Sequence, residues 1–116
     1  MSSKYKSCFY CERKFGDIPY NSNFPLKRTD DHIHPISKGG TFHKLNIIQA
    51  CEKCNSIKGD KTLEEFECFI QEWINDGFQT RKGYTPSLLW TISINIKKLY
   101  ETRNEYKILI ECLESN

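Results

Sequence analysis

The stretches Cys8-Phe9-Tyr10-Cys11 and Cys51-Glu52-Lys53-Cys54 decide the fold of this chain, and they enclose the segment Asp31-His32-Ile33-His34-Pro35. Two cysteines separated by two residues present both sulfurs from one tight turn, so two such pairs can complete one tetrahedral zinc site. We therefore predict one structural Zn²⁺ per chain, with four ligands: Cys8, Cys11, Cys51 and Cys54.

Composition indicates one small globular domain. The chain has 116 residues, of which 38% are hydrophobic and 28% are charged. The first eight residues lack the apolar core of a signal peptide, and no run approaches the roughly 18 apolar residues of a membrane span. We therefore expect a cytoplasmic protein with no membrane partner. In a reducing compartment six cysteines favour metal binding over three disulfides, which are the alternative.

The two spare cysteines, Cys68 and Cys112, each stand alone within a helical pattern, and we expect both to be small buried side chains.

Charge is unevenly distributed along the chain. Residues 1–62 hold 11 Lys/Arg and 6 Asp/Glu, and residues 63–116 hold 6 and 9, which together account for the 17 basic and 15 acidic residues of the chain. A basic half that carries the motif favours an anionic substrate at that half. The acidic half is expected to provide structural support for the basic half or to form a surface that faces another protein.

The first half is predicted to contain two strands and a short helix. The first strand is expected from Lys27 to Ile36, followed by a turn at Gly39-Gly40, because glycine accepts backbone angles that other residues avoid. The returning strand is expected over Asn46–Cys51. A short helix should then run from Glu52 to Lys58 and end at Gly59.

The second half is predicted to be helical. Thr62-Leu63-Glu64-Glu65 matches a capping box, and the apolar spacing that follows predicts a helix over Leu63–Asp76. Thr85 as N-cap and Pro86 in the first turn predict another helix that continues to Leu113. The strict alternation over Trp90–Ile96 would also suit a strand, so the start of this helix is open.

Apolar residues recur three and four positions apart along the last helix, and Arg103 is the polar occupant of this heptad seam. The seam comprises Leu89, Ile92, Ile96, Leu99, Tyr106, Ile110 and Leu113. Packing within one chain and a homodimer through this helix are the two ways to cover it.

The order CxxC, DHIHPxSxGG, Asn46-Ile47-Ile48 and CxxCNxxKGxxT resembles the HNH endonucleases over Cys8 to Thr62. The resemblance implies an α+β fold: a small ββα-metal finger with a four-cysteine zinc site, here followed by a helical C-terminal extension. We accordingly divide the chain into a nuclease core, residues 1–62, and an extension, residues 63–116, that packs on it.

The resemblance implies cleavage of phosphodiester bonds in DNA, with double-stranded DNA favoured and RNA or single strands left open. It assigns His32 as general base, Asp31 and Asn55 as ligands of a catalytic divalent cation, and Asn46 as the residue that fixes the loop between the strands. The chemistry of the residues agrees, because imidazole accepts a proton and carboxylate and amide oxygens suit Mg²⁺.

Other residues receive auxiliary roles. His34 would share the face of His32 in an extended chain and could orient the phosphate, protonate the leaving group or bind the metal. His43 is expected to be an exposed loop histidine or a phosphate contact. Four flanking lysines could bind the nucleic-acid backbone without reading sequence: Lys38, Lys44, Lys58 and Lys61.

Two non-catalytic readings compete with a nuclease. In one, Asp31, His32 and Asn55 only cap turns or line the core of a zinc-ribbon-like binding module. In the other, a zinc domain reads DNA without cleaving it. A DNA reader needs a basic recognition helix, and neither of the two C-terminal helices is basic enough to supply one.

Overall fold

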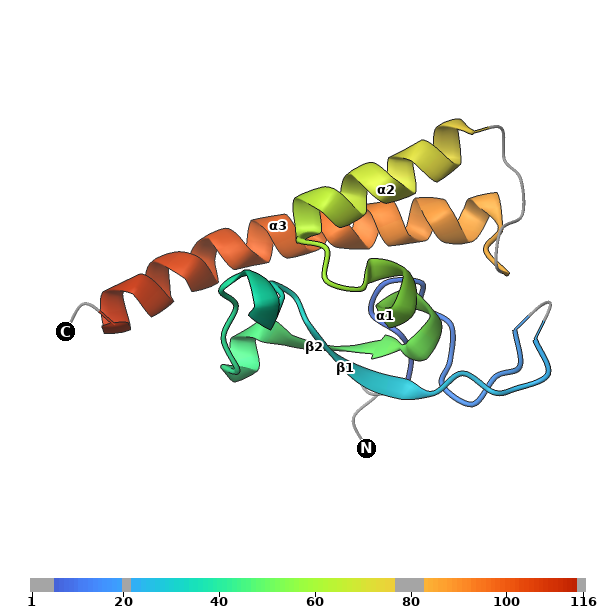
Figure 1. The fold of residues 1–116 in the computed structure, drawn as a ribbon, viewed down its shortest axis with the longest axis horizontal. Helices are drawn as coiled ribbons and strands as arrows, with labels where there is room; N and C mark the ends of the chain where they lie inside the picture. Colours follow the sequence, from blue (N-terminus) through green and yellow to red (C-terminus); the bar gives the residue numbers. More distant parts are fainter. Residues whose placement is uncertain (1–5, 20–21, 77–82, 115–116) are drawn as a thin grey trace.

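The computed structural model describes residues 6–19, 22–76 and 83–114, and it describes side chains as far as Thr102. Its elements follow the order β1 (Arg28–His32), β2 (Ile47–Cys51), α1 (Glu52–Lys58), α2 (Leu63–Asn75) and α3 (Pro86–Glu114). Figure 1 shows the two strands and α1 on one side of the paired helices α2 and α3. The α+β fold expected from the sequence is confirmed.

The strands form an antiparallel hairpin in which Arg28 faces Cys51 and His32 faces Ile47. The first strand is shorter than predicted, because it ends at His32 instead of Ile36. Pro35 lacks a backbone N–H for a ladder, and the chain enters a 3-10 turn at Ile36–Lys38 that Gly39 ends with φ of 92°. The returning strand has the predicted C-terminal end.

Helix α1 has the predicted bounds. Cys51 acts as its N-cap, and its Sγ accepts a hydrogen bond from the backbone N–H of Cys54. Gly59 ends the helix with a positive φ of 54°, which glycine adopts without a Cβ penalty. One cysteine pair therefore spans the junction between β2 and α1.

Helix α2 begins with the predicted capping box. The Thr62 hydroxyl accepts from the N–H of Glu65, and the Glu65 carboxylate accepts from the N–H of Thr62. Its buried face carries Leu63, Phe66, Ile70 and Ile74. The prediction that Cys68 is buried was wrong, because Cys68 lies two residues after Phe66, on the opposite side of the helix.

Helix α3 also begins as predicted, with the Thr85 hydroxyl accepting from the N–H of Leu88. The alternation over Trp90–Ile96 is helical and not a strand. Leu89, Ile92, Ile96 and Leu99 are buried against the rest of the chain. The remaining seam residues and Cys112 lie outside the described side chains, although the helix backbone projects past the other elements (Figure 1).

The core is continuous between the two halves of the chain. Tyr10, in the first cysteine turn, packs edge-on against Phe66 of α2, with ring centroids 5.3 Å apart. Asn95 of α3 donates a 2.8 Å hydrogen bond to the backbone oxygen of Tyr10. Among the described residues, no helix is both long and apolar enough to span a membrane.

Candidate functional site

The four predicted zinc ligands converge at one point. The Sγ atoms of Cys8, Cys11, Cys51 and Cys54 lie within 4.8 Å of one another, and all four residues are buried. Four thiolates about 2.3 Å from one zinc would be about 3.8 Å apart, so the cluster suits tetrahedral Zn²⁺. It joins the N-terminal turn to the start of α1.

Two side chains donate hydrogen bonds to this cluster. The hydroxyl of Tyr84, which precedes α3, donates to Sγ of Cys54 at 3.1 Å. Nε of Arg13 donates to Sγ of Cys11 at 3.2 Å, and its guanidinium lies 4.8 Å from the centroid of the Tyr84 ring. Donors of this kind orient thiolates and offset the negative charge of a zinc–thiolate centre.

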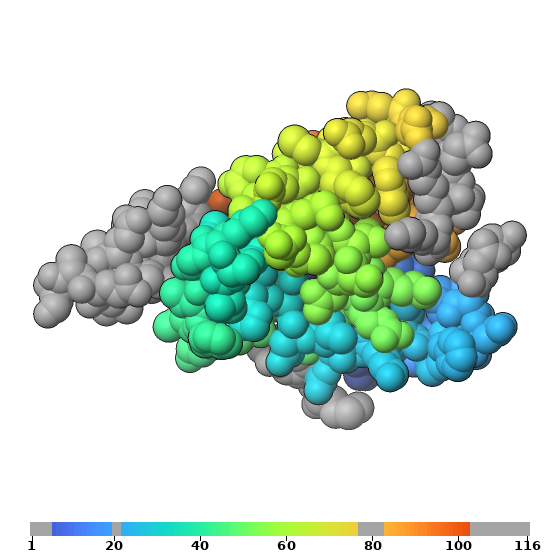
Figure 2. Space-filling model, in the orientation of Figure 1, coloured from blue at the N-terminus to red at the C-terminus, as the bar shows by residue number. Residues whose placement is uncertain are grey.

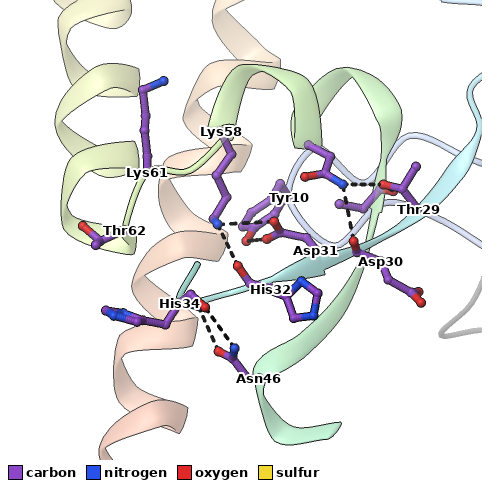
Figure 3. A network of polar contacts seen from close by, with 12 residues as sticks. Tyr10, Thr29, Asp30, Asp31, His32, His34, Asn46, Lys58, Lys61 and Thr62 are labelled. Carbon is purple, nitrogen blue, oxygen red and sulfur yellow. Dashed lines mark hydrogen bonds and ion pairs between the residues drawn. The ribbon is translucent and has the colours of Figure 1, made fainter. Parts of the chain in front are cut away.

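Asp31 and His32 lie on opposite faces of β1, as successive strand residues do. Asp31 points towards α1 and is only 3% exposed, whereas His32 is half-buried and points away from Lys58 (Figure 3). The ring of His32 meets the ring of Phe42 edge-on, with centroids 5.3 Å apart.

Three residues form a buried polar network around Asp31 (Figure 3). The Tyr10 hydroxyl donates to Oδ2 at 2.7 Å, and Nζ of Lys58 contacts Oδ1 at 3.3 Å. Lys58 is fully buried and also donates to the backbone oxygen of His32 at 3.0 Å. Burial raises the pKa of Asp31, while Lys58, Tyr10 and His32 act in the opposite direction.

Asn55 extends from α1 towards β1. Its Nδ2 donates to Thr29 Oγ1 at 3.0 Å and to the backbone oxygen of Asp30 at 3.4 Å. With the amide nitrogen used in this way, Oδ1 is the atom left to act as a ligand.

Asp31, His32 and Asn55 line one concavity of about 340 Å³ between the end of β1 and α1. The other residues around it are Asp30, Pro35, Ile36, Ser37, Gly59 and Asp60. The structure thus brings the three principal predicted residues to one concavity, in which His32 and Asn55 are partly exposed and Asp31 is buried.

Asn46 closes the loop between β1 and β2. Its Oδ1 accepts from the N–H of His34 at 2.9 Å, and its Nδ2 donates to the backbone oxygens of His34 and Thr41. The side chain is 6% exposed, so these bonds are shielded from water. Asn46 therefore joins both ends of the loop that follows His32.

A family model described as HNH endonuclease matches residues 8–68, more than half of the chain. The chain belongs to the HNH endonuclease family. The comparisons with curated proteins and with solved structures found no match. The family match contains the cysteine cluster, both strands and α1, and it ends inside α2. Tyr84 and the whole of α3 lie beyond it.

The expectation that His34 shares the face of His32 was wrong. The strand stops at His32, so the two-residue period does not reach His34. The rings point in opposite directions in Figure 3, and Nε2 of His34 lies 2.9 Å from the backbone oxygen of Lys38. In this arrangement His34 holds the 3-10 turn.

The lysines predicted to contact nucleic acid differ in their surroundings. Lys58 cannot contact the backbone of a nucleic acid from its position, because it is fully buried beside Asp31. Lys38 is paired with Glu65 at 2.6 Å. Lys61 donates to the backbone oxygen of Ile57 at 3.0 Å and lies 4.5 Å from the centroid of the Phe69 ring. Lys44 is exposed.

His43 is exposed, as expected for a loop histidine. Its Nδ1 accepts a hydrogen bond from the N–H of Leu45 and caps the 3-10 turn at Lys44–Asn46.

Sequence reasoning missed two residues of the candidate site, Tyr10 and Asp60, and gave Lys58 the wrong role, a contact with nucleic acid. Tyr10 gave no signal, because one tyrosine between two cysteines is equally typical of packing. Lys58 follows the motif cysteines closely, and its buried pairing depends on the distance between α1 and β1. Asp60 lines the concavity and directly follows Gly59, the residue that ends α1. Its position next to this predicted helix end is a signal from which it could have been included among the site residues.

Proposed function

We propose that this protein is a metal-dependent endonuclease that hydrolyses phosphodiester bonds in DNA, with His32 as the general base. The observation that supports this most is the shared concavity of Asp31, His32 and Asn55 within the region matched by the HNH endonuclease family. Hydrolysis needs an activated water and compensation for charge on the phosphate and the departing oxygen. A proton acceptor and hard oxygen ligands in one concavity suit these needs.

The donor set fits one hard divalent cation held by Asp31 and Asn55. Each carboxylate oxygen of Asp31 has one hydrogen-bond donor in the described structure, and a carboxylate oxygen has two acceptor sites. The cysteines form the only group of three or more His, Cys, Asp or Glu with converging ligand atoms in the described part. A site with only one or two protein ligands suits Mg²⁺, because this ion keeps several waters and also binds phosphate oxygens of the substrate. When bound, the cation would stabilise charge on the phosphate and the leaving oxygen.

His32 would accept the proton of the attacking water through a ring nitrogen. Its backbone is fixed from two directions, because its oxygen accepts from Lys58 and the next N–H, that of Ile33, donates to the backbone oxygen of Asn46. Phe42 contacts its ring. These contacts limit the positions of the imidazole, and a general base must lie within hydrogen-bond distance of its water.

The structural Zn²⁺ of this proposal binds the four buried cysteines and links the N-terminal turn to α1, the helix that carries Asn55. Zinc would therefore set the distance between Asn55 and β1 without taking part in the reaction. One zinc per chain by metal analysis is the expected result, and a folded sample without zinc would contradict it.

A non-catalytic nucleic-acid-binding module is the alternative. Helix α2 carries no lysine or arginine, and α1 has seven residues, with one of its two lysines, Lys58, buried. Neither helix suits a basic recognition surface, and this favours the nuclease.

The decisive experiment incubates the protein with plasmid, linear duplex DNA, single-stranded DNA and RNA under Mg²⁺, Mn²⁺ or Ni²⁺. Duplex cleavage that needs a divalent cation is expected. His32→Ala should lower the rate at least about 100-fold, the lower end of general-base contributions. Its zinc content, melting temperature and DNA affinity should equal those of the parent. A His32→Ala variant as active as the parent would remove the general base, and no cleavage of any substrate would favour the binding module.

Homodimerisation through α3 is also part of this proposal, because the helix projects past the rest of the molecule and its apolar spacing continues to Leu113. Ile96 cannot test it, since Ile96 is fully buried within the chain. Light scattering should instead compare the parent with Ile110→Asp, using the half-exposed Ile94 of the same helix, as Ile94→Asp, for control. A monomeric parent would contradict the dimer, and a dimer dispersed only by Ile94→Asp would place the interface elsewhere.

A further inference from the structure

Phe42 is an exposed aromatic residue beside the proposed general base. Its exposed fraction is 74%, although a phenylalanine is usually largely buried. Single exposed apolar residues are common and need no function. Phe42 differs in that its ring contacts His32, with the two rings nearly perpendicular and their centroids 5.3 Å apart, while most of its surface remains exposed.

The backbone around Phe42 is held on both sides. Before it, the Thr41 backbone oxygen accepts from Asn46 Nδ2 at 2.8 Å. After it, the N–H of His43 donates to Thr41 Oγ1, and His43 caps the next 3-10 turn. Gly40 packs so closely that a Cβ there would collide with the backbone oxygen of His34. A ring on a fixed backbone loses little entropy on binding, so it suits a contact surface.

The loop that carries Phe42 is part of the exposed surface beside the site. Figure 2 shows the segment after β1, in teal, as a lobe next to α1 and below α2. His43 and Lys44 follow Phe42 directly, and both are exposed. An aromatic ring beside a cation is the combination that single-stranded nucleic acids require, since the ring stacks on a base while the cation meets the phosphate.

We propose that Phe42 stacks on an unpaired nucleobase next to the phosphate that is cleaved. This inference rests on the proposed function, which places a phosphate at His32. Bases follow one another about 3.4 Å apart along a strand, so a ring 5.3 Å from the His32 ring lies within about two nucleotides of that phosphate. The substrate class is nucleic acid with an unstacked base at the cut: a single strand, a mismatch or a duplex opened locally.

Binding is measured by fluorescence anisotropy without added divalent cation, so that cleavage does not interfere. The probes are a labelled 20-nucleotide single strand, its perfect duplex and a duplex with one central mismatch. Phe42→Ala should weaken binding to the single strand and the mismatched duplex about 5- to 150-fold, the range measured for one base–aromatic stack. The perfect duplex should be affected less.

The matched control is Phe24→Ala. Phe24 has an almost equal exposed fraction, 73%, but belongs to the loop before β1, away from the lobe with Phe42 (Figure 1). It should leave all three affinities unchanged. Phe42→Trp should retain binding because indole also stacks, while Phe42→Leu should lose most of it.

Three results would overturn the proposal. Equal losses in Phe42→Ala and Phe24→Ala would show a general apolar effect, and full affinity in Phe42→Leu would show a contact that needs no ring. A lower cleavage rate in Phe42→Ala with unchanged affinities would mean that Phe42 only positions His32. The proposed function fails separately, if the parent cleaves no nucleic acid; cleavage by the parent with any of these three results refutes the stacking alone.

Discussion

The hydroxyl of Tyr84 donates a 3.1 Å hydrogen bond to Sγ of Cys54, and this links the segment before α3 to the cysteine cluster. Tyr84 is fully buried and lies beyond the region matched by the HNH endonuclease family. Burial raises its pKa, so the hydroxyl keeps its proton and remains a donor. A residue of the C-terminal extension thus contacts a cysteine cluster that lies within the region matched by the family.

The first prediction is that Tyr84→Phe weakens zinc retention. The change removes one hydroxyl and leaves the ring, and loss of a residue that hydrogen-bonds a metal ligand typically costs about 10- to 100-fold in affinity. Zinc transfer to a chromophoric chelator should be correspondingly faster. Tyr100→Phe is the control, because Tyr100 belongs to α3 and packs at the edge of the core. Equal zinc release from the two variants would contradict a role for Tyr84.

The second prediction concerns the buried pair of Asp31 and Lys58. Lys58→Met should destabilise the protein by about 3–5 kcal/mol, because it leaves the carboxylate buried without its cation. The double variant Asp31→Asn with Lys58→Met removes both charges and should be less destabilised than the two single losses together. Chemical denaturation of the four proteins measures this coupling. Additive losses would mean that the pair contributes no interaction energy.

The same pair predicts a pH dependence. The pKa of Asp31 is raised by burial, and loss of Lys58 should raise that pKa further. A carboxyl with a raised folded-state pKa binds its proton more tightly when folded, so stability falls as pH rises through that pKa. The deficit of Lys58→Met should therefore be smallest near pH 4 and larger at pH 7. A deficit that shrinks as pH rises would contradict the assignment.

A third prediction follows from Glu65, whose pKa is lowered to about 2 by Lys38 and by the N–H of Thr62. A carboxyl whose pKa is lowered in the folded protein stabilises the fold at pH values above its ordinary pKa. This stabilisation is lost as the pH falls towards 2. Glu65→Gln keeps an acceptor for Thr62 but cannot titrate, so its melting temperature should fall less between pH 5 and pH 2. Glu64→Gln, next to it in the first turn of α2, is the control and should follow the parent.

Local patterns predicted the fold where one interaction decides the structure. The cysteine spacing predicted the cluster because one metal accepts four sulfurs in a single geometry. The capping box predicted the start of α2, and Gly59 predicted the end of α1, because each depends on residues within one turn. Asp31, His32 and Asn55 could be assigned to one site from the order of the family motif.

The predictions failed where contacts between distant parts of the chain determine the position of a side chain. Lys58 is polar and near a helix end, which favours solvent, but Asp31 on β1 compensates for its burial. The direction of the His34 side chain depends on where β1 ends, and the 3-10 turn after Pro35 determines that end. The alternation over Trp90–Ile96 is a different case: it fits two periods and leaves the start of α3 open, and packing of α3 on α2 selects the predicted helix, with the polar Ser93 and Asn95 buried between apolar neighbours.

The last prediction is that the helical extension is needed to hold the first cysteine turn. Asn95 of α3 is 3% exposed, and its Nδ2 donates to the Tyr10 backbone oxygen at 2.8 Å and to Glu12 Oε2 at 3.0 Å. Glu12 has a positive φ of 65°, which costs energy in a residue with a Cβ and must be maintained by its surroundings. Asn95 therefore contacts both the turn between Cys8 and Cys11, through Tyr10, and the strained residue that follows it, Glu12.

Asn95→Ala should lower the free energy of unfolding by about 1–3 kcal/mol, since it leaves the buried backbone oxygen of Tyr10 without this donor. Asn95→Asp should cost more, because it places a carboxylate against the Tyr10 oxygen and the Glu12 carboxylate. Asn75→Ala is the matched control, because Asn75 is an exposed helical asparagine at the end of α2. In the Asn95 variants the melting temperature should fall and zinc release should become faster. In the control neither quantity should change. Stability lost without faster zinc release would mean that Asn95 supports α3 alone and that the first cysteine turn holds its shape independently.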